Sequence, residues 1–295
     1  MSGKLKELRE RIKSVQKTQQ ITRAMKLVSA SKLRRAQDRI VQMRPYSNKL
    51  QEILGNISSG VDINLKYAEE RDTQKVLLVV IASDGGLCGA FNSQIIKLAS
   101  TLLAEKYPAQ LKARTVSVLP LGKRSAAAFK RRSDVTVVDT YVNIFQQLSF
   151  DKAAAAAQTI MDGFVSGEYD VVEIVYSQFK NAATQLPRVE RMLPVPKNAP
   201  TATASTTNID FIFQPDKESL LLELAPKILK TQLYKAILDS NASEHGARLT
   251  AMDKATNNAQ ELIRQYSISY NRARQATITN EILEVVSGAN ALESA

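Results

Sequence analysis

The sequence predicts an α/β protein in which a long antiparallel coiled coil of the N- and C-terminal helices carries an inserted domain with a mostly parallel sheet. Two observations predict this class. Both ends of the 295-residue chain are long stretches of helix-forming residues with almost no glycine or proline, whereas the middle alternates apolar strands with helical stretches. Strands that are apolar along their whole length are typical of a sheet covered by helices on both faces.

The N-terminal arm, residues 4–54, is predicted to be one very long helix. It contains no glycine, has Pro45 as its only breaker, and is dominated by strong helix formers. Apolar residues recur at steps of three and four, as in Leu33, Ala36 and Ile40, which favours packing on a single partner helix. Pro45 is expected to kink the helix or to remove one hydrogen bond. We assign residues 1–58 to this coiled-coil helix.

The C-terminal arm is predicted from residues 227–287, where Gly246 is the only breaker and Pro226 stands just before the first turn. Its seam is predicted to be rich in alanine, so that a partner helix can approach closely. The predicted seam residues are Met252, Ala255, Ala259, Leu262, Tyr266, Ser269, Ala273, Ala276, Asn280 and Leu283. At 1.5 Å per residue each arm reaches roughly 80 to 95 Å. The simplest interpretation pairs the arms as an antiparallel coiled coil; the alternative is two ordinary amphipathic helices in a bundle.

The middle of the chain, residues 75–197, is predicted to form the α/β domain. Four apolar runs, each followed by a helical stretch or a turn, are expected to be strands: 76–83, 115–122, 135–142 and 171–179. A fifth run, 185–196, has prolines near its limits and is expected to lie at an edge of the sheet. Small polar residues dominate the next segment, so 198–212 is predicted to be a linker and 213–295 the C-terminal coiled-coil helix.

The positive charge of the chain is concentrated at its start. Lys and Arg number 40 against 29 Asp and Glu, yet residues 1–54 alone hold 14 basic and 4 acidic side chains. The rest of the chain is therefore nearly neutral, which excludes a uniformly basic nucleic-acid coat. Composition alone leaves two partners open for the basic arm, a nucleic acid or an acidic protein surface.

Several classes of site and location are disfavoured by the residue counts. One cysteine, Cys88, and one histidine, His245, disfavour an internal disulfide, a cysteine- or histidine-rich metal site and a Ser-His-Asp triad. The longest uncharged stretches are 12 residues long, too short to span a bilayer. The charged first residues resemble neither a signal peptide nor a transit peptide, so a cytoplasm-like compartment is expected.

The glycine-rich segment SDGGLCGAFN, residues 83–92, is the candidate nucleotide site, because it follows the first strand and opens a helix. Its spacing fits neither of the common phosphate-binding motifs. A tight turn that allows close packing explains it as well, and Cys88 is expected to be a small buried residue of that turn. His245 is expected to be solvated or to lie at the edge of the helical seam.

Three segments, 11–40, 83–92 and 242–292, carry a resemblance in the same order and with the same spacing. They resemble the gamma subunit of the rotary proton-translocating ATP synthase, of the bacterial type. The resemblance implies a coiled coil of the terminal helices with an inserted Rossmann-like domain. It also implies a central-stalk rotor that transmits torque from the membrane c-ring to a catalytic hexamer of alpha and beta subunits.

The resemblance implies partners and contact residues as well. The partners are the alpha and beta subunits, the epsilon subunit and the c-ring, with no nucleic acid, no cofactor, no metal, no catalytic residue and no membrane span. The chain is expected at the cytoplasmic face of the bacterial plasma membrane. Met25 and Lys26 are expected contacts, Met25 matching the family's methionine that faces an acidic hinge segment of beta. Arg274 and Gln275 match a pair that hydrogen-bonds a beta loop.

Two points qualify the resemblance. Family members often carry an arginine where this chain has Gly85, so any contact of that arginine is not expected here. The alternative function is a basic coiled-coil protein that binds nucleic acid along the N-terminal arm. Against it, Tyr46 is the only aromatic residue in the first 54 positions, and the basic residues are spread around the helix.

Overall fold

The computed structural model describes residues 2–58, 66–195 and 217–293. These residues form two compact units: 1–29 with 249–295, called here the two-helix unit, and 30–248, called the sheet unit. The elements are α1 (Ser2–Ser58), β1 (Val76–Ile81), α2 (Phe91–Lys106), α3 (Pro108–Ala113), β2 (Val116–Leu121), α4 (Lys123–Phe129), β3 (Thr136–Val137), the 3₁₀ helix η1 (Ile144–Gln147), α5 (Phe150–Val165), β4 (Val171–Phe179), β5 (Gln185–Leu193) and α6 (Lys217–Glu293).

The sheet has the strand order β3-β2-β1-β4-β5. All neighbouring strands are parallel except β5, which pairs antiparallel with β4, so the prediction of a mostly parallel sheet with this edge strand is confirmed. The strand expected over 135–142 is wrong in length, because only Thr136–Val137 pairs with β2. The charged Asp139 ends it, since its carboxylate pairs with Lys130 at the surface.

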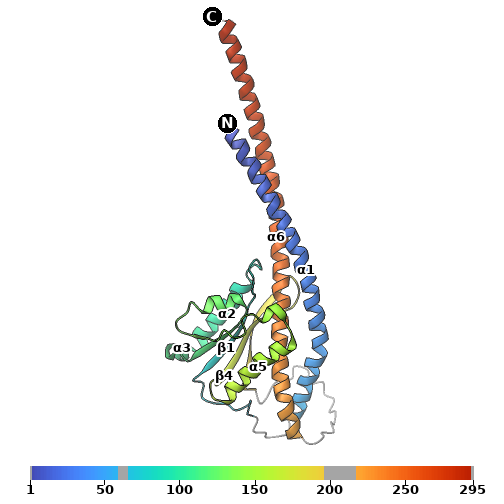
Figure 1. Ribbon diagram of the computed structural model, residues 1–295, viewed down its shortest axis with the longest axis vertical. Helices are drawn as coiled ribbons and strands as arrows, with labels where there is room; N and C mark the ends of the chain where they lie inside the picture. Colours follow the sequence, from blue (N-terminus) through green and yellow to red (C-terminus); the bar gives the residue numbers. More distant parts are fainter. Residues whose placement is uncertain (1, 59–65, 196–216, 294–295) are drawn as a thin grey trace. The chain divides into compact units, whose positions relative to one another are not determined.

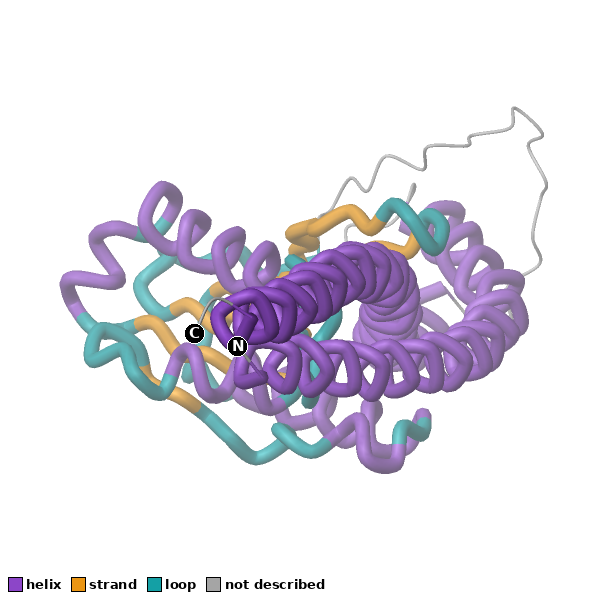
Figure 2. The backbone as a smooth tube through the Cα atoms, turned by 90° about the horizontal axis from the view of Figure 1, so that it is seen from above, coloured by secondary structure: helices purple, strands orange, loops and turns teal. Residues whose placement is uncertain are grey.

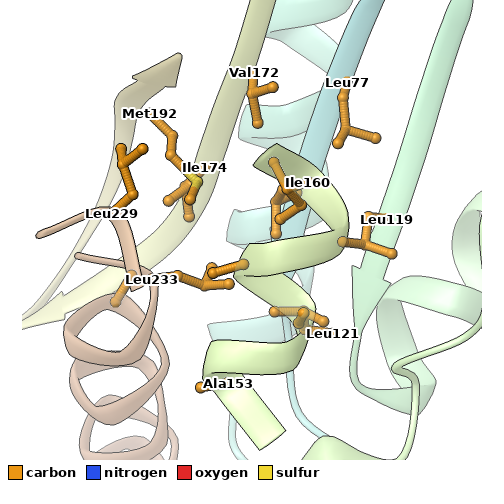
Figure 3. Close-up of a cluster of buried hydrophobic side chains, with 14 of the residues drawn as sticks. Leu77, Leu119, Leu121, Ala153, Ile160, Val172, Ile174, Met192, Leu229 and Leu233 are labelled. Atoms are coloured by element: carbon orange, nitrogen blue, oxygen red, sulfur yellow. The ribbon is translucent and has the colours of Figure 1, made fainter. Parts of the chain in front are cut away.

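Helices cover the sheet on both faces, as the unbroken apolar strands predicted. On one face α5 and α6 pack on the strands, with Ile160, Leu229 and Leu233 in the same buried cluster as Leu77 and Ile174 (Figures 1 and 3). On the other face α2 and α4 contribute to a second buried cluster. The sheet unit therefore holds two apolar layers that share one sheet.

Within the sheet unit, α6 is buried on almost every side from Ala236 to Gly246. A Cβ atom added at Gly246 would lie 3.3 Å from the backbone of Ala182, so glycine lets the helix approach the β4–β5 connection closely. The N-terminal seam prediction is confirmed here, because Leu33, Ala36 and Ile40 are all buried.

Both long helices pass through a proline. α6 begins at Lys217, so Pro226 lies inside the helix and the prediction that it stands before the first turn is wrong. Pro45 lies inside α1 in the same way. The expected linker, 198–212, lies outside the described residues, and the domain boundaries given above stay predictions.

Candidate functional site

The two-helix unit consists of the first part of α1 and the last part of α6, which lie side by side (Figures 1 and 2), and polar contacts join them. The hydroxyls of Thr22 and Thr256 are 2.8 Å apart. Further along, the Arg9 guanidinium donates to the Tyr270 hydroxyl over 2.9 Å, and this bond raises the pKa of Arg9. Because 13 residues of α1 span the same length as 14 residues of α6, the helices are antiparallel with little change in register.

From Leu262 to Ala276, every second residue of the predicted C-terminal seam is exposed, and its neighbour in the sequence is covered instead. Thr256, Ile263, Tyr270 and Thr277 are partly covered, whereas Leu262, Ser269 and Ala276 of the predicted seam are exposed. The predicted positions Met252 and Ala259 are buried, as expected. Steps of three then four and of four then three have the same period, so the apolar pattern alone cannot choose between them. Two of the covered residues, Thr256 and Tyr270, bond to polar side chains of α1, and the seam has fewer alanines than predicted.

The residues expected to contact partners fall at two separate levels of this unit. Met25 and Lys26 on α1 are half-buried, and the Lys26 ammonium is 2.5 Å from the Asp253 carboxylate on α6. Arg274 and Gln275 are exposed. They lie 21 and 22 residues beyond Asp253 on α6, about 30 Å along the helix axis at 1.5 Å per residue. The structure therefore does not bring the two predicted pairs together.

A groove beside Lys26 is lined only by polar residues from the two helices. Its lining residues are Gln19, Gln20, Arg23, Lys26, Asp253, Thr256, Asn257 and Gln260. The ion pair within it leaves both side chains more than two-fifths exposed, so water screens the pair and its contribution to stability is small. The groove was not predicted from the sequence, because it depends on polar residues of two helices that lie far apart in the sequence and flank the same seam.

Large apolar side chains are unusually exposed in the two-helix unit. Ten of the seventeen exposed large apolar or aromatic residues among the described residues belong to it: Ile21, Leu27, Val28, Leu262, Ile268, Ile278, Ile282, Leu283, Val285 and Val286. This unit holds only about a quarter of the chain. Such concentrations of exposed apolar surface mark places where another protein binds.

The glycine-rich turn 83–92 is closed by its own hydrogen bonds. The Ser83 hydroxyl donates to Asn92 and the Ser83 amide donates to the same oxygen. The Asn92 amide nitrogen donates to the sulfur of Cys88, which is buried as expected. Leu87 has a positive φ of 63° and is exposed at the tip. Several polar groups of the turn are therefore bonded within it.

α6 carries buried ionisable residues beside this turn. Glu244 and Arg248 pair at 2.7 Å, one helical turn apart, and burial raises the pKa of Glu244 although Arg248 opposes the shift. His245 is buried, so the expectation of a solvated or seam-edge histidine is wrong. The pKa of His245 is lowered to about 4, mainly by burial and also by the positive charges of Arg248 and Lys32. The Glu244–Arg248 ion pair is therefore largely buried, close to Lys32 of α1 and to the turn 83–92.

Comparison with known proteins identifies the family. A family profile described as ATP synthase matches residues 4–292. The ATP synthase gamma chain of Cytophaga hutchinsonii is 50% identical over 293 residues, covering 98% of this chain and 99% of the relative. The corresponding chain of Flavobacterium psychrophilum is also 50% identical over 98% of this chain and 99% of its own length. The chain belongs to the ATP synthase gamma chain family.

Solved structures agree with this family assignment. A chain from the central stalk and c-ring structure of the Tetrahymena thermophila mitochondrial ATP synthase is 26% identical, with a TM-score of 0.57 over 80% of this chain and 99% of that chain. A chain from the Euglena gracilis mitochondrial ATP synthase has a TM-score of 0.67 at 19% identity, covering 100% of this chain and 96% of that chain, and shows the same fold.

Family membership also decides between the two functions that the sequence left open. As a gamma chain, this protein is a subunit of ATP synthase, and the comparisons give no support to the nucleic-acid alternative. Among the described residues, no helix is both long enough and apolar enough to cross a membrane.

Proposed function

We propose that this chain is the rotor of the ATP synthase central stalk and carries torque from a proton-driven c-ring to a hexamer of alpha and beta subunits. The observation that supports this best is the two-helix unit of a gamma-family chain, which holds ten of the seventeen large apolar or aromatic side chains that are exposed among the described residues. A chain that stood alone would gain stability by burying them. Inside a hexamer pore they would meet partner surfaces instead.

The asymmetry of the two-helix unit suits this role. A single pair of helices in a pore with threefold symmetry presents a different face to each of three equivalent sites, so rotation exchanges the states of the sites. Moving one site from 1:99 to 99:1 requires about 5.5 kcal/mol of differential contact. Many shallow polar and apolar contacts can supply this energy without holding one orientation so firmly that rotation stops.

Four residues are proposed as contacts with the beta subunits. Met25 and Lys26 lie half-buried beside the polar groove, while Arg274 and Gln275 are exposed on α6. Lys26 already has Asp253 as a partner, so an acidic beta loop would compete with or extend that ion pair. Arg274 has a planar guanidinium with several donors and suits a carboxylate or carbonyl of a beta loop.

We also propose that the chain performs no bond chemistry and binds at the cytoplasmic face of a bacterial plasma membrane. The sheet unit would then bind the epsilon subunit and the c-ring, while catalysis remains with the hexamer. The internal bonding of the turn 83–92 supports a structural role for the residues at the carboxyl ends of the strands.

The test is reconstitution of the complete ATP synthase in lipid vesicles, with and without this chain. Vesicles with the chain should pump protons in proportion to ATP hydrolysed, and a protonophore should abolish the gradient. Coupled pumping in vesicles that lack the chain would overturn the proposal. For the contact residues, the double variant Arg274→Ala with Gln275→Ala should lower the pumping rate, while Lys97→Ala, on an exposed lysine of α2, should not.

A further inference from the structure

Two serines of α6 donate hydrogen bonds to the sheet rather than to their own helix. The Ser240 hydroxyl donates to the Ile81 carbonyl over 3.2 Å, and the Ser243 hydroxyl donates to the Ser177 carbonyl over 3.0 Å. Both serines are almost completely buried. Serines elsewhere on α6, such as Ser267, donate to a carbonyl one turn earlier in the same helix. The two buried serines are therefore directed at the sheet.

The accepting carbonyls lie where the pairing of β1 and β4 ends. The last pair in the register of these strands is Val80 with Val175. Ile81 and Ser177 lie beyond it, toward the carboxyl ends of β1 and β4. The strands that follow β1 lie on one side of it, whereas β4 lies on its other side, so the strand order changes direction between β1 and β4. In doubly wound sheets this is the place where ligands usually bind. Here two hydroxyls of α6 take that place.

A third contact extends the same line to the glycine-rich turn. The Arg248 guanidinium donates to the Gly86 carbonyl over 3.2 and 3.4 Å. Its other side is held by the buried Glu244 carboxylate and by the ring of His245. The guanidinium also lies next to Gly85, because a Cβ added there would be 3.5 Å from it, an ordinary van der Waals contact.

These contacts follow one another along α6 just before the end of the sheet unit at Arg248. Each acceptor is a backbone carbonyl, so its position is fixed by the main chain and does not change when side chains rotate. A buried carbonyl that loses its donor is costly, so sliding or turning of α6 against the sheet and the turn would break all four bonds at once. The arrangement resists relative motion in a way that apolar packing alone does not, because packing is not directional.

We propose that Ser240, Ser243 and Arg248 form the attachment through which torque passes between the sheet and α6. They are positioning residues: they hold the helix to the strand ends and contact no nucleotide. The proposal rests on the rotor function proposed above and adds a specific place in the chain where rotation of the sheet unit becomes rotation of α6.

The test uses the complete reconstituted enzyme with four substitutions, Ser240→Ala, Ser243→Ala, Glu244→Gln and Arg248→Met. Glu244 is changed together with Arg248 so that no buried carboxylate is left unpaired. The protons pumped per ATP hydrolysed should fall relative to the wild type, while hydrolysis by the hexamer continues. The matched control is Ser93→Ala with Ser166→Ala, because these serines donate to carbonyls of their own turns.

Hydrogen exchange on the isolated chain provides a second measurement. The amides of Lys123 and Arg124 donate to Asp84 and to the Ser83 carbonyl, so their exchange reports opening of the turn. Loss of a bond worth about 1 kcal/mol should speed exchange that requires this opening about fivefold. Arg248→Lys keeps a donor and the positive charge. Compared with the variant that carries Arg248→Met, it should restore much of the protection of the turn amides and much of the coupling of pumping to hydrolysis.

The outcomes separate this proposal from the rotor function. Wild-type enzyme that does not couple hydrolysis to pumping would overturn the rotor function itself. Wild-type and variant enzymes that couple equally well, although exchange in the turn is faster in the variant, would overturn only the attachment. If the fourfold variant does not assemble, the pair Ser240→Ala and Ser243→Ala alone decides by the same comparison.

Discussion

The sheet unit and the two-helix unit are stabilised by different kinds of contact. Two clusters of completely buried apolar side chains hold the sheet unit together. Among the described residues of the two-helix unit, those that are buried are Thr22, Ser29, Met252 and Ala259, two of them polar. Both α1 and α6 contribute residues to both units, and α6 changes from a buried core helix to an exposed one along its length.

The two units therefore meet different demands. The sheet unit must keep its shape by itself, because it would have to carry a load as one body. The two-helix unit leaves apolar surface open, which favours a structure that is completed by its partners. The polar seam then fixes how the helices pair without using the apolar side chains that the partners need.

The largest expected effect compares two leucines of the same helix. Leu233 is completely buried in the sheet unit, whereas Leu262 is 41% exposed in the two-helix unit. Leu233→Ala should lower the free energy of unfolding by about 2 to 5 kcal/mol, because it leaves a cavity. Leu262→Ala should change it by less than about 1 kcal/mol. Urea denaturation followed by circular dichroism measures both, and equal losses would remove the distinction between the units.

A second prediction concerns the buried histidine of the sheet unit. His245 has a pKa of about 4 in the folded chain and 6.5 in its unperturbed form, so the unfolded state binds the proton first as the pH falls. Stability should therefore decrease between about pH 6.5 and 4, by about 1 to 3 kcal/mol. The neighbouring Glu244 acts in the opposite direction, because its pKa is raised in the fold.

Comparison with His245→Gln isolates the histidine from Glu244. The glutamine variant should lack the histidine-dependent decrease in the free energy of unfolding between pH 6.5 and 4. A wild type and a glutamine variant with parallel pH profiles would show that His245 accepts its proton without a penalty in the fold.

In the two-helix unit, the Thr22–Thr256 contact should show the behaviour of a polar seam. Thr22→Val alone leaves Thr256 with its intrahelical acceptor but without its partner, and should cost about 1 kcal/mol. The double change of both residues to valine should be nearly neutral, since an apolar pair of similar shape fills the same space. A double-mutant cycle by hydrogen exchange of α1 amides measures the coupling, and purely additive effects would contradict the seam.

The smallest effect is expected at the Lys26–Asp253 ion pair. Its side chains are 42% and 47% exposed, so Asp253→Asn should change stability by no more than about 0.2 to 1 kcal/mol. The change should shrink further in molar salt, because screening weakens exposed pairs. A large loss of stability that persists at high salt would indicate a buried pair, contrary to the exposure of both side chains in the structure.

Much of the fold could be predicted because its signals are local. The unbroken apolar runs of β1 and β4 and the seam of Leu33, Ala36 and Ile40 reflect burial that the sequence period encodes directly. The proline within β5 did not obscure the edge strand, since Pro187 needs no ladder donor at an edge.

The candidate site was less predictable because it depends on phase and on distant partners. Leu262 and Ile263 fit the same helical period, so the sequence could not show that the partner helix covers Ile263 instead of Leu262. His245 was expected at the surface or at the seam edge, yet it is buried in the folded chain, near Arg248 of α6 and Lys32 of α1. The hydroxyls of Ser240 and Ser243 gave no sequence signal, because their acceptors are backbone carbonyls.

The most direct test of the contrast between the units is hydrogen exchange on the isolated chain and on the chain assembled with alpha and beta subunits. The account predicts that amides of 2–29 and 249–293 exchange rapidly in the isolated chain and gain strong protection on assembly. Amides of β1 and β4 should be equally protected in both. Amides of the two-helix unit that are already as protected in the isolated chain as those of β1 would contradict the account.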